Sequence, residues 1–500
     1  MKRAIAAIGA AGALFLLLAI PAAPPWPGPA SGGAAAFVWD RDAYWSSLEQ
    51  QFLSARATEC AAVDMDAGRE LAALHASLER LATARVAPES PALDSIEVRY
   101  FGLAPLLAAC PAGAAGYVRL QGRLRETYKD QSRQWNVTRP ATRARLYSAL
   151  YGSRAAAEEV LLHHPDSIPP LLPGRNETSA APRALVHGVE IRSGDILVSR
   201  GGYPTSALIA RGNDYPGNFS HVALVHIDSA TGSASTIEAH IERGVSIATA
   251  EEYLGDKKLR IMVLRLRADL PALAADPLLP HRAATRALER ARSGRIGYDF
   301  SMDYTDPSRL FCSEVASSVY RELGVTLWTG LSTISAPGLR RWLASFGVEH
   351  FETQEPSDLE YDPQLVVVAE WRDPASLFAD HVDNAVVDAM LERAEKGTGL
   401  DFSWYRLPVA RAAWAYGWLA RRLGRDGPIP EGMSAEAALR NAAFTAAQRR
   451  IAGAVRERAE TLRRARGYPP PYWTLLELAR TAAAGWSGGP SVLLSARPNR

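Results

Sequence analysis

A cysteine near the start of a predicted helix is the strongest candidate for a reactive group in this sequence. Cys312 lies in Arg309-Leu-Phe-Cys-Ser-Glu-Val, and Val315 and Val319 follow it on one apolar helix face. A thiol in the first helical turn faces unpaired N–H groups and the positive end of the macrodipole, which should lower its pKa toward the nucleophilic thiolate. The alternative is a buried cysteine that packs as a small hydrophobic side chain. The chemical interpretation therefore requires a base elsewhere in the chain.

A histidine at the beginning of an apolar strand can supply that base. The segment His221–Ile227 is predicted as a central strand because both of its faces are apolar. An imidazole can take a proton from a thiol and return it to a leaving group, provided that an acceptor orients the ring. If the segment Thr236–Ile241 pairs with this strand as a hairpin, Glu238 and His240 share one face near His221. The spacing leaves open which of these two residues orients the imidazole.

The order of the short motifs in this region resembles that of a known enzyme family. The motifs are Ser193-Gly-Asp-Ile-Leu, Phe219-Ser-His-Val-Ala-Leu-Val, Ile237-Glu-Ala, Gly297-Tyr-Asp-Phe and Phe311-Cys-Ser-Glu-Val. They resemble the circularly permuted NlpC/P60 (papain-like) cysteine hydrolases, which include the YiiX/YebB-like group and are related to lecithin-retinol acyltransferase-type enzymes. In unpermuted relatives the Cys helix precedes the His strand, whereas here the histidine comes first. The resemblance places the nucleophile at Cys312, the base at His221 and the orienting acid at Glu238.

The resemblance implies hydrolysis of an amide bond through a thioester acyl-enzyme, without a metal or an organic cofactor. The expected substrates are cell-wall peptides or N-acyl amino acids, an expectation that rests on family analogy. Backbone N–H groups at the start of the Cys312 helix would stabilise the oxyanion. Two alternatives stay open: lipid deacylation or acyl transfer of the lecithin-retinol acyltransferase type, and a catalytically inactive binding or scaffold module of the cell envelope.

Further residues in these motifs are candidates for the pocket or for support of the triad. They are Asp195, His240, Tyr298, Asp299 and Ser313. Each also has a structural explanation, such as an aspartate in a turn before a strand or a serine in a first helical turn. The sequence has no CxxC motif and no His-Cys cluster, so no structural zinc site is predicted.

The candidate site lies in a predicted α+β domain over residues 185–372. A proline-rich linker over residues 165–182 precedes this domain. The hydrophobic pattern predicts strands at Gly194–Val198, His221–Ile227, Thr236–Ile241 and Leu259–Leu266, and helices at 280–293 and 312–322. The resemblance implies a circularly permuted papain-like (NlpC/P60) domain, in which a mostly antiparallel sheet packs against the Cys312 helix.

A mainly helical domain with a small strand insert is predicted over residues 38–175. One apolar helix face is formed by Leu71, Leu74, Leu78 and Leu81. Ile96, Val98 and Tyr100 alternate with charged residues, the pattern of a half-buried strand, which Val118, Leu120 and Leu124 would continue. A further helix is predicted to begin at Thr138-Arg-Pro140.

The C-terminal region, residues 375–480, is also predicted to be helical. Ser434 would cap a long helix that ends at Gly467, and residues 481–500 are predicted as a flexible tail. Aromatic residues mix with arginines at Trp404, Tyr405, Trp414, Tyr416 and Trp418 and at Arg406, Arg411, Arg421 and Arg422. Such a mixture is typical of an interfacial membrane helix, but the surrounding Ala and Leu residues favour packing in the domain core.

The N-terminus has the pattern of an export signal over residues 1–23. Lys2-Arg3 is a basic start, Ala4–Ile20 is apolar, and Pro21-Ala-Ala offers small residues for cleavage. We therefore expect an exported protein of the periplasm or cell envelope, or one that stays anchored by an uncleaved signal. In such a compartment Cys60 and Cys110 are expected to form a disulfide, which leaves Cys312 free.

The charge balance argues against one class of partner. The 500 residues contain 56 Lys and Arg against 54 Asp and Glu, a formal net charge of +2. A nearly neutral chain has no electrostatic reason to bind nucleic acid. The expected partners are a peptide or N-acyl amide substrate, together with the cell wall or a membrane surface.

Overall fold

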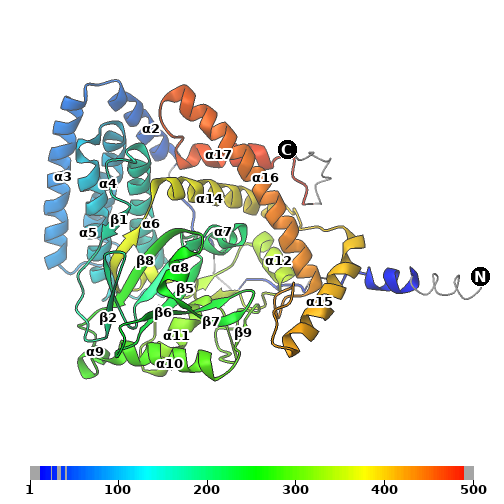
Figure 1. Cartoon of the computed structure of the whole chain (residues 1–500). Helices are drawn as coiled ribbons and strands as arrows, with labels where there is room; N and C mark the ends of the chain where they lie inside the picture. Colours follow the sequence, from blue (N-terminus) through cyan, green and yellow to red (C-terminus); the bar gives the residue numbers. More distant parts are fainter. Residues whose placement is uncertain (1–11, 24, 31–34, 40–41, 489–500) are drawn as a thin grey trace, which may run out of the picture.

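A seven-stranded antiparallel sheet forms the centre of the molecule (Figure 1). The structure is a computed structural model and describes residues 12–23, 25–30, 35–39 and 42–488. In spatial order the strands are β1 (Leu171–Pro173), β13 (Leu365–Trp371), β8 (Lys258–Leu266), β4 (Ile196–Gly201), β5 (His221–Ile227), β6 (Ala234–His240) and β7 (Gly244–Thr249). Every neighbouring pair is antiparallel. Helices combined with an antiparallel sheet confirm the predicted α+β class.

Both faces of β5 are covered, as its continuous apolar sequence predicts. Val222 and Leu224 face helices α10 (Leu279–Ser293) and α11 (Cys312–Glu322) within one hydrophobic core. On the opposite face, Ala223, Val225 and Ile227 pack with Tyr253 of α8 (Ala250–Gly255) in another core. The two cores hold the start of β5 and the N-terminus of α11 in a fixed relation.

The α-helices between residues 42 and 163 precede the sheet and form one side of the molecule (Figure 1). They are α2 (Asp42–Arg56), α3 (Cys60–Thr83), α4 (Pro91–Ala109), α5 (Ala114–Ser132) and α6 (Pro140–His163). Leu74, Leu78 and Leu81 are buried along α3, in agreement with the predicted helix face. Helix α6 begins at Pro140, as predicted.

The strand insert predicted for this region is wrong. Ile96 and Tyr100 lie in α4, where their four-residue spacing buries both, whereas Val98 is 53% exposed. The apparent alternation came from Glu97, which is buried and bound to Arg145 at 2.9 Å. Val118, Leu120 and Leu124 likewise belong to a helix, α5. A buried, paired glutamate between apolar residues of a helix therefore gave the alternating pattern that is typical of a strand.

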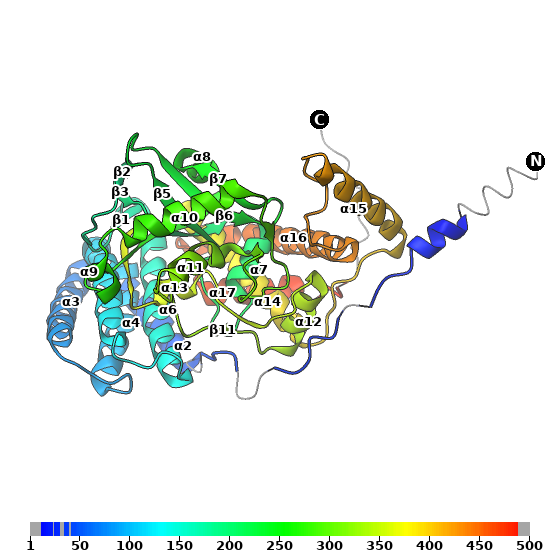
Figure 2. The ribbon, with the colours of Figure 1, turned by 90° about the horizontal axis from the view of Figure 1, so that it is seen from below.

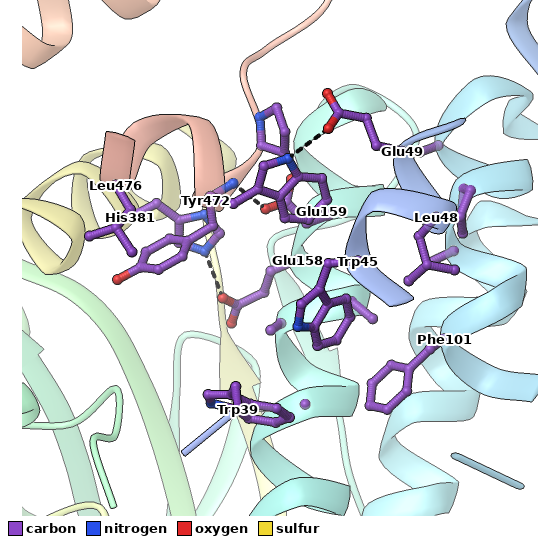
Figure 3. Close-up of a pocket in the computed structure, with 18 of the residues that line it drawn as sticks. Trp39, Trp45, Leu48, Glu49, Phe101, Glu158, Glu159, His381, Tyr472 and Leu476 are labelled. Atoms are coloured by element: carbon purple, nitrogen blue, oxygen red, sulfur yellow. Dashed lines mark hydrogen bonds and ion pairs between the residues drawn. The ribbon is translucent and has the colours of Figure 1, made fainter. Parts of the chain in front are cut away.

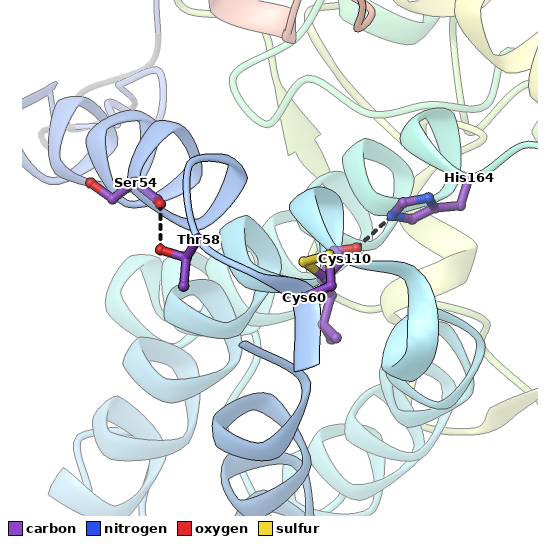
Figure 4. The surroundings of a disulfide bond; sticks show 6 residues. Ser54, Thr58, Cys60, Cys110 and His164 are labelled. Carbon is purple, nitrogen blue, oxygen red and sulfur yellow. Dashed lines mark hydrogen bonds between the residues drawn. A yellow bond between two sulfur atoms is a disulfide. The ribbon is translucent and has the colours of Figure 1, made fainter. Parts of the chain in front are cut away.

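A disulfide joins Cys60 and Cys110 (Figure 4). It connects the first residue of α3 to the residue after α4, with 5.5 Å between the Cα atoms and 50 residues between the two positions. Nearby, the ring of His164 hydrogen-bonds to the carbonyl of Leu107 at 2.7 Å. The bond fastens two helices of the N-terminal region, and Cys312 is the free thiol.

The helices after the sheet extend from beside the N-terminal helices toward the opposite side of the molecule (Figure 1, Figure 2). They include α14 (Pro374–Glu395), α15 (Leu407–Arg422), α16 (Ala435–Arg466) and α17 (Tyr472–Ala483). Ser434 caps α16 by accepting a hydrogen bond from the Ala437 N–H, and Gly467 ends it with φ at 75°. Both positions were predicted.

Two expectations for this side are wrong. Trp414 and Trp418 are 42% and 46% exposed, so α15 does not bury them in a core. The tail predicted from residue 481 is helical as far as Ala483, because α17 continues to pack against α14 and α16. Residues 489–500 lie outside the described residues, as do residues 1–11 of the expected signal. Residues 12–18 are helical, and within the described ranges none of the helices has the length and apolar character to cross a bilayer.

A buried network of ion pairs joins the N-terminal helices to the sheet. Arg154 of α6 binds Glu370 of β13 and also Glu360, which lies in α13 (Asp358–Tyr361). Glu158 of α6 binds Arg260 of β8 at 2.6 Å. Arg125 of α5 and Asp380 of α14 add further links to the same network. All of these side chains are at most 4% exposed, so each charge depends on its partners for the solvation that it has lost.

We expect Glu370→Gln to destabilise the protein by about 3–5 kcal/mol, because it leaves buried arginines without a counter-charge. The free energy of unfolding from urea titration at neutral pH measures this change. The matched control is Glu460→Gln, which removes an exposed partner of Arg463 and should leave the unfolding midpoint unchanged. Equal midpoints for both variants and the wild type would show that the network does not stabilise the fold.

Candidate active site

Cys312 is the first residue of α11 and lies beside the start of β5. Its side chain is 4% exposed, and its Sγ is 4.0 Å from the carbonyl oxygen of Ser220. The helix begins in a fixed position because the Glu314 carboxylate accepts the Phe311 N–H at 3.2 Å. Since Ser220 directly precedes His221, the thiol contacts the backbone of the residue next to the imidazole-bearing residue.

His221, Glu238 and His240 form a cluster across β5 and β6. His221 Nε2 lies 2.7 Å from one carboxylate oxygen of Glu238, and His240 Nε2 lies 3.4 Å from the other. The strand register explains this arrangement, because Ala223 pairs with Glu238 and the two histidines occupy adjacent positions on the same face. Their ring centroids are 5.5 Å apart. Glu238 is therefore the group that contacts His221, and His240 contacts the same carboxylate.

The electrostatics of the cluster determine where the imidazole proton lies. Burial raises the pKa of Glu238, but hydrogen bonds from His221 and His240 outweigh it and hold that pKa well below its ordinary value. Burial lowers the pKa of His221, against the raising influence of Glu238. An ionised carboxylate only accepts hydrogen bonds, so Nε2 of a neutral His221 donates to Glu238 and Nδ1 is left unprotonated. Nδ1 is thus the atom that can accept a proton.

The thiol does not have the low pKa expected from its place at a helix N-terminus. Burial raises the pKa of Cys312 to about 12, and the nearby Glu355 carboxyl acts in the same direction. The N–H groups of Val222 and Ser313 act in the opposite direction but do not reverse the shift. The prediction of a stabilised thiolate is therefore wrong for this state, because loss of solvent outweighs the helix macrodipole.

The thiol and the imidazole approach from different faces of β5. His221 shares its face with Ala223 and Val225, whereas α11 packs on the face of Val222 and Leu224. Among the residues that the structure describes, no hydrogen bond joins Cys312 Sγ to an imidazole. The contact of the thiol closest to His221 is with the carbonyl oxygen of Ser220, the residue before it.

The remaining candidate residues are distributed around this site. The carboxylate of Asp195 takes no part in the cluster, because Arg265 binds it through two contacts of 2.8 Å and the Arg192 N–H donates to it. Asp299 accepts the N–H groups of Ser301 and Asp303 and so fixes its own loop. Tyr298 is near the thiol, since burial and Cys312 both raise its pKa, and Ser313 is fully buried in the first turn of α11.

Two functional candidates were not found from the sequence. Glu355 is 5% exposed and lies close enough to influence both Cys312 and Tyr298. Burial, and to a smaller extent the neighbouring Asp358, raise the pKa of Glu355 well above its ordinary value. Tyr253 donates a hydrogen bond to Ser199 Oγ at 2.9 Å on the same sheet face as His221. Neither residue belongs to a motif with recognisable spacing, so only the fold reveals them.

The His221, Glu238 and His240 cluster has a donor set that suits a divalent cation. One ligand atom from each residue lies within 4.8 Å of the others. Two imidazoles and one carboxylate form a common zinc ligand set. The same nitrogen and oxygen atoms make the hydrogen bonds described above, so a bound cation would replace those bonds and occupy the imidazole of His221.

A separate cavity of about 350 Å³ lies between the N-terminal helices, α14 and α17 (Figure 3). Aromatic side chains such as Trp39, Trp45 and Phe101 line it, and Glu158 and His381 of the buried ionic network form part of its wall. None of its lining residues belongs to the His221 cluster or is Cys312. The candidate active site is therefore distinct from this cavity.

The central region matches a known enzyme family. Residues 190–369 match the family model of permuted papain-like amidase enzymes of the YaeF/YiiX type, family C92. The matched region includes Cys312, His221 and Glu238. The match confirms the resemblance to the permuted papain-like YiiX group, and it identifies the protein as an enzyme of the cysteine peptidase or amidase kind.

One solved structure is also similar to this region. It is the crystal structure of the metalloprotein yiiX from Escherichia coli O157:H7, with 19% sequence identity. The match covers 36% of this chain and 97% of that chain, and its TM-score is 0.29. No curated protein matches the chain.

Alkylation of Cys312 by iodoacetamide should become faster with rising pH and should still be accelerating at about pH 10. This follows because the thiol pKa is raised to about 12, so only a small fraction is thiolate at neutral pH. Mass-spectrometric labelling rates from pH 5 to pH 10 provide the test, with Cys312→Ser as the blank. A rate that reaches a plateau below about pH 8 would instead indicate a thiolate–imidazolium pair.

Proposed function

We propose that this protein is an exported cysteine hydrolase that cleaves an amide bond in a cell-envelope substrate. The observation that carries the proposal is the bond between His221 and Glu238 at the start of β5, next to Ser220, whose carbonyl oxygen Cys312 contacts. The family match supports the reaction class, and the motif order supports a permuted papain-like arrangement. Cell-wall peptides and N-acyl amino acids are the proposed substrates.

The proposed reaction begins with proton transfer from the Cys312 thiol to Nδ1 of His221. The two atoms must come into contact in the reactive complex, because no hydrogen bond joins them among the described residues. The thiolate then attacks the amide carbonyl carbon, and N–H groups in the first turn of α11 stabilise the oxyanion. The imidazolium gives its proton to the leaving amine, which produces a thioester. A water molecule, deprotonated by His221, hydrolyses the thioester and regenerates the thiol.

Glu238 has a defined role in this scheme. Its carboxylate holds Nε2–H, so the imidazole presents an unprotonated Nδ1. It also compensates the positive charge that develops when His221 accepts the thiol proton. His240 approaches the same carboxylate from its other oxygen and is proposed to position Glu238.

Two other functions are alternatives to this proposal. Lipid deacylation or acyl transfer uses the same nucleophile and base but an ester or thioester substrate. An inactive envelope module would keep the fold without turnover. The bond between His221 and Glu238, and the contact of Cys312 with Ser220 beside His221, support the proposal of an enzyme.

The proposal predicts turnover of amide substrates by the wild type and none by Cys312→Ser. The assay compares muropeptides, N-acyl amino acids and phospholipids, with and without EDTA, by mass spectrometry of the products. We expect release of an amine and a free carboxylate from an amide member of the panel, unchanged by EDTA. Turnover of phospholipid alone would support the lipid alternative, loss with EDTA would indicate a metal-dependent reaction, and no turnover of any substrate would contradict the proposed function.

Two substitutions distinguish the partner of His221 from its neighbour. Glu238→Gln should reduce kcat by about 10²-fold or more. The amide N–H2 can donate to Nε2 and so favour the His221 tautomer with its proton on Nδ1, and a neutral amide does not compensate the positive charge of the imidazolium. His240→Ala should have a much smaller effect, since the contact between His221 and Glu238 persists. Steady-state kinetics on the active substrate, with circular dichroism to show that each variant is folded, provide the measurement. A larger loss for His240→Ala would reverse these assignments.

A further inference from the structure

Helix α15 presents an apolar and aromatic surface to solvent. Its buried side is a narrow stripe of small or compact residues: Leu407, Pro408, Ala410, Gly417 and Ala420. The exposed side carries Val409 at 70%, Tyr416 at 61%, Leu419 at 54% and Leu423 at 71% exposure, together with the half-exposed Trp414 and Trp418. A surface helix normally has the reverse distribution, with its apolar side against the core. We call the exposed side, with Trp404 and Tyr405 in the preceding turn, the α15 face.

The charge of this segment has a single sign. Arg406, Arg411, Arg421, Arg422 and Arg425 lie between residues 402 and 425, and no Asp or Glu occurs there. Arg411 and Arg421 are used internally, because they bind the carbonyl groups of Leu18 and Ile429. Arg406, Arg422 and Arg425 are exposed, and Arg422 lies over the Trp418 ring at 3.8 Å. Aromatic residues beside free arginines are typical of a helix at the boundary of an anionic bilayer.

A second apolar segment lies beside the α15 face. The helix of residues 12–18, blue in Figures 1 and 2, is next to the segment that leads into α15 in both views. Phe15 contacts Trp404 with ring centroids 6.5 Å apart. Leu14, Leu16 and Leu17 are 59%, 61% and 67% exposed. In the full-length chain the two apolar segments are therefore adjacent at this end of the molecule.

The α15 face is connected to the candidate active site through the loop that follows α15. Ile429 and Met433 of this loop pack against Ile241 and Phe300 in a shared core. Ile241 follows His240 directly, and the ring of Phe300 contacts that of Tyr298 at 5.1 Å. The loop that follows α15 therefore packs beside residues that flank the His221 cluster and Tyr298.

We propose that the α15 face binds the surface of an anionic phospholipid bilayer and presents the active site to substrates held at that surface. The exposed Trp and Tyr side chains would lie at the headgroup level, Val409, Leu419 and Leu423 would enter the acyl boundary, and the free arginines would contact lipid phosphates. The substrate class is then an amphipathic acyl compound with its amide at the interface. This last point rests on the proposed function, whereas bilayer binding does not.

The test uses the full-length protein and vesicles of phosphatidylethanolamine and phosphatidylglycerol, with pure phosphatidylcholine for comparison. Hydrogen exchange of residues 402–423 should slow on addition of the anionic vesicles, while α3 exchanges as before. The α15 variant, Trp414→Ala/Trp418→Ala/Leu419→Ala, should bind these vesicles about tenfold more weakly or worse. The matched control is Met65→Ala/Val98→Ala/Leu185→Ala, which removes exposed apolar side chains elsewhere and should bind like the wild type.

The outcomes separate the two proposals. Unchanged exchange at 402–423 in vesicle-bound protein would show that another segment holds the chain, and would overturn the role of the α15 face. Equal binding of the α15 variant and the control would do the same. The α15 variant should retain hydrolysis of a soluble amide but lose rate on the same amide in vesicles. If vesicle binding is as expected but neither protein hydrolyses any amide, the proposed function fails and the bilayer surface stands.

Discussion

The arrangement of this protein depends on a buried set of ion pairs between its helical and sheet regions. Arginines of α5 and α6 meet glutamates of β13 and α13, while Glu158 of α6 meets Arg260 of β8. Taking such charges from water is costly, and only the full set of partners offsets the cost. The sheet can therefore adopt one position against the N-terminal helices. Because β8, β4 and β5 are neighbours in this sheet, that position also fixes β5 and the start of α11 beside it.

The same low-dielectric interior sets the chemistry of the site. It lowers the pKa of His221 and raises that of Cys312, so both groups are neutral in this state. Glu238 is the exception, because two imidazole hydrogen bonds outweigh its burial. A neutral imidazole fixed by an ionised carboxylate is a base with a defined acceptor atom. What the resting site lacks is contact between that atom and the thiol.

Local patterns in the sequence predicted much of the central region. The bounds of β5 and α11, and the hairpin that brings Glu238 to His221, follow from apolar runs and a turn. Contacts between distant segments were not predictable in this way. Glu97 imitated a strand because its partner Arg145 is 48 residues away, and Glu355 reaches the thiol only through the fold. The prediction of a low thiol pKa was wrong for the same reason. The helix macrodipole can be inferred from local sequence, whereas the burial of the thiol depends on the fold of the whole molecule.

The high thiol pKa has a consequence for an enzyme of the proposed location. A thiolate is the form that attacks disulfides and reacts with oxidants, so a thiol kept protonated and 4% exposed resists both reactions in an oxidising compartment. A protonated thiol is also less reactive toward the substrate than the thiolate of a permanently ionised thiolate–imidazolium pair would be. In the proposed mechanism, contact with His221 Nδ1 in the reactive complex resolves this conflict, because it provides the base only when substrate is bound.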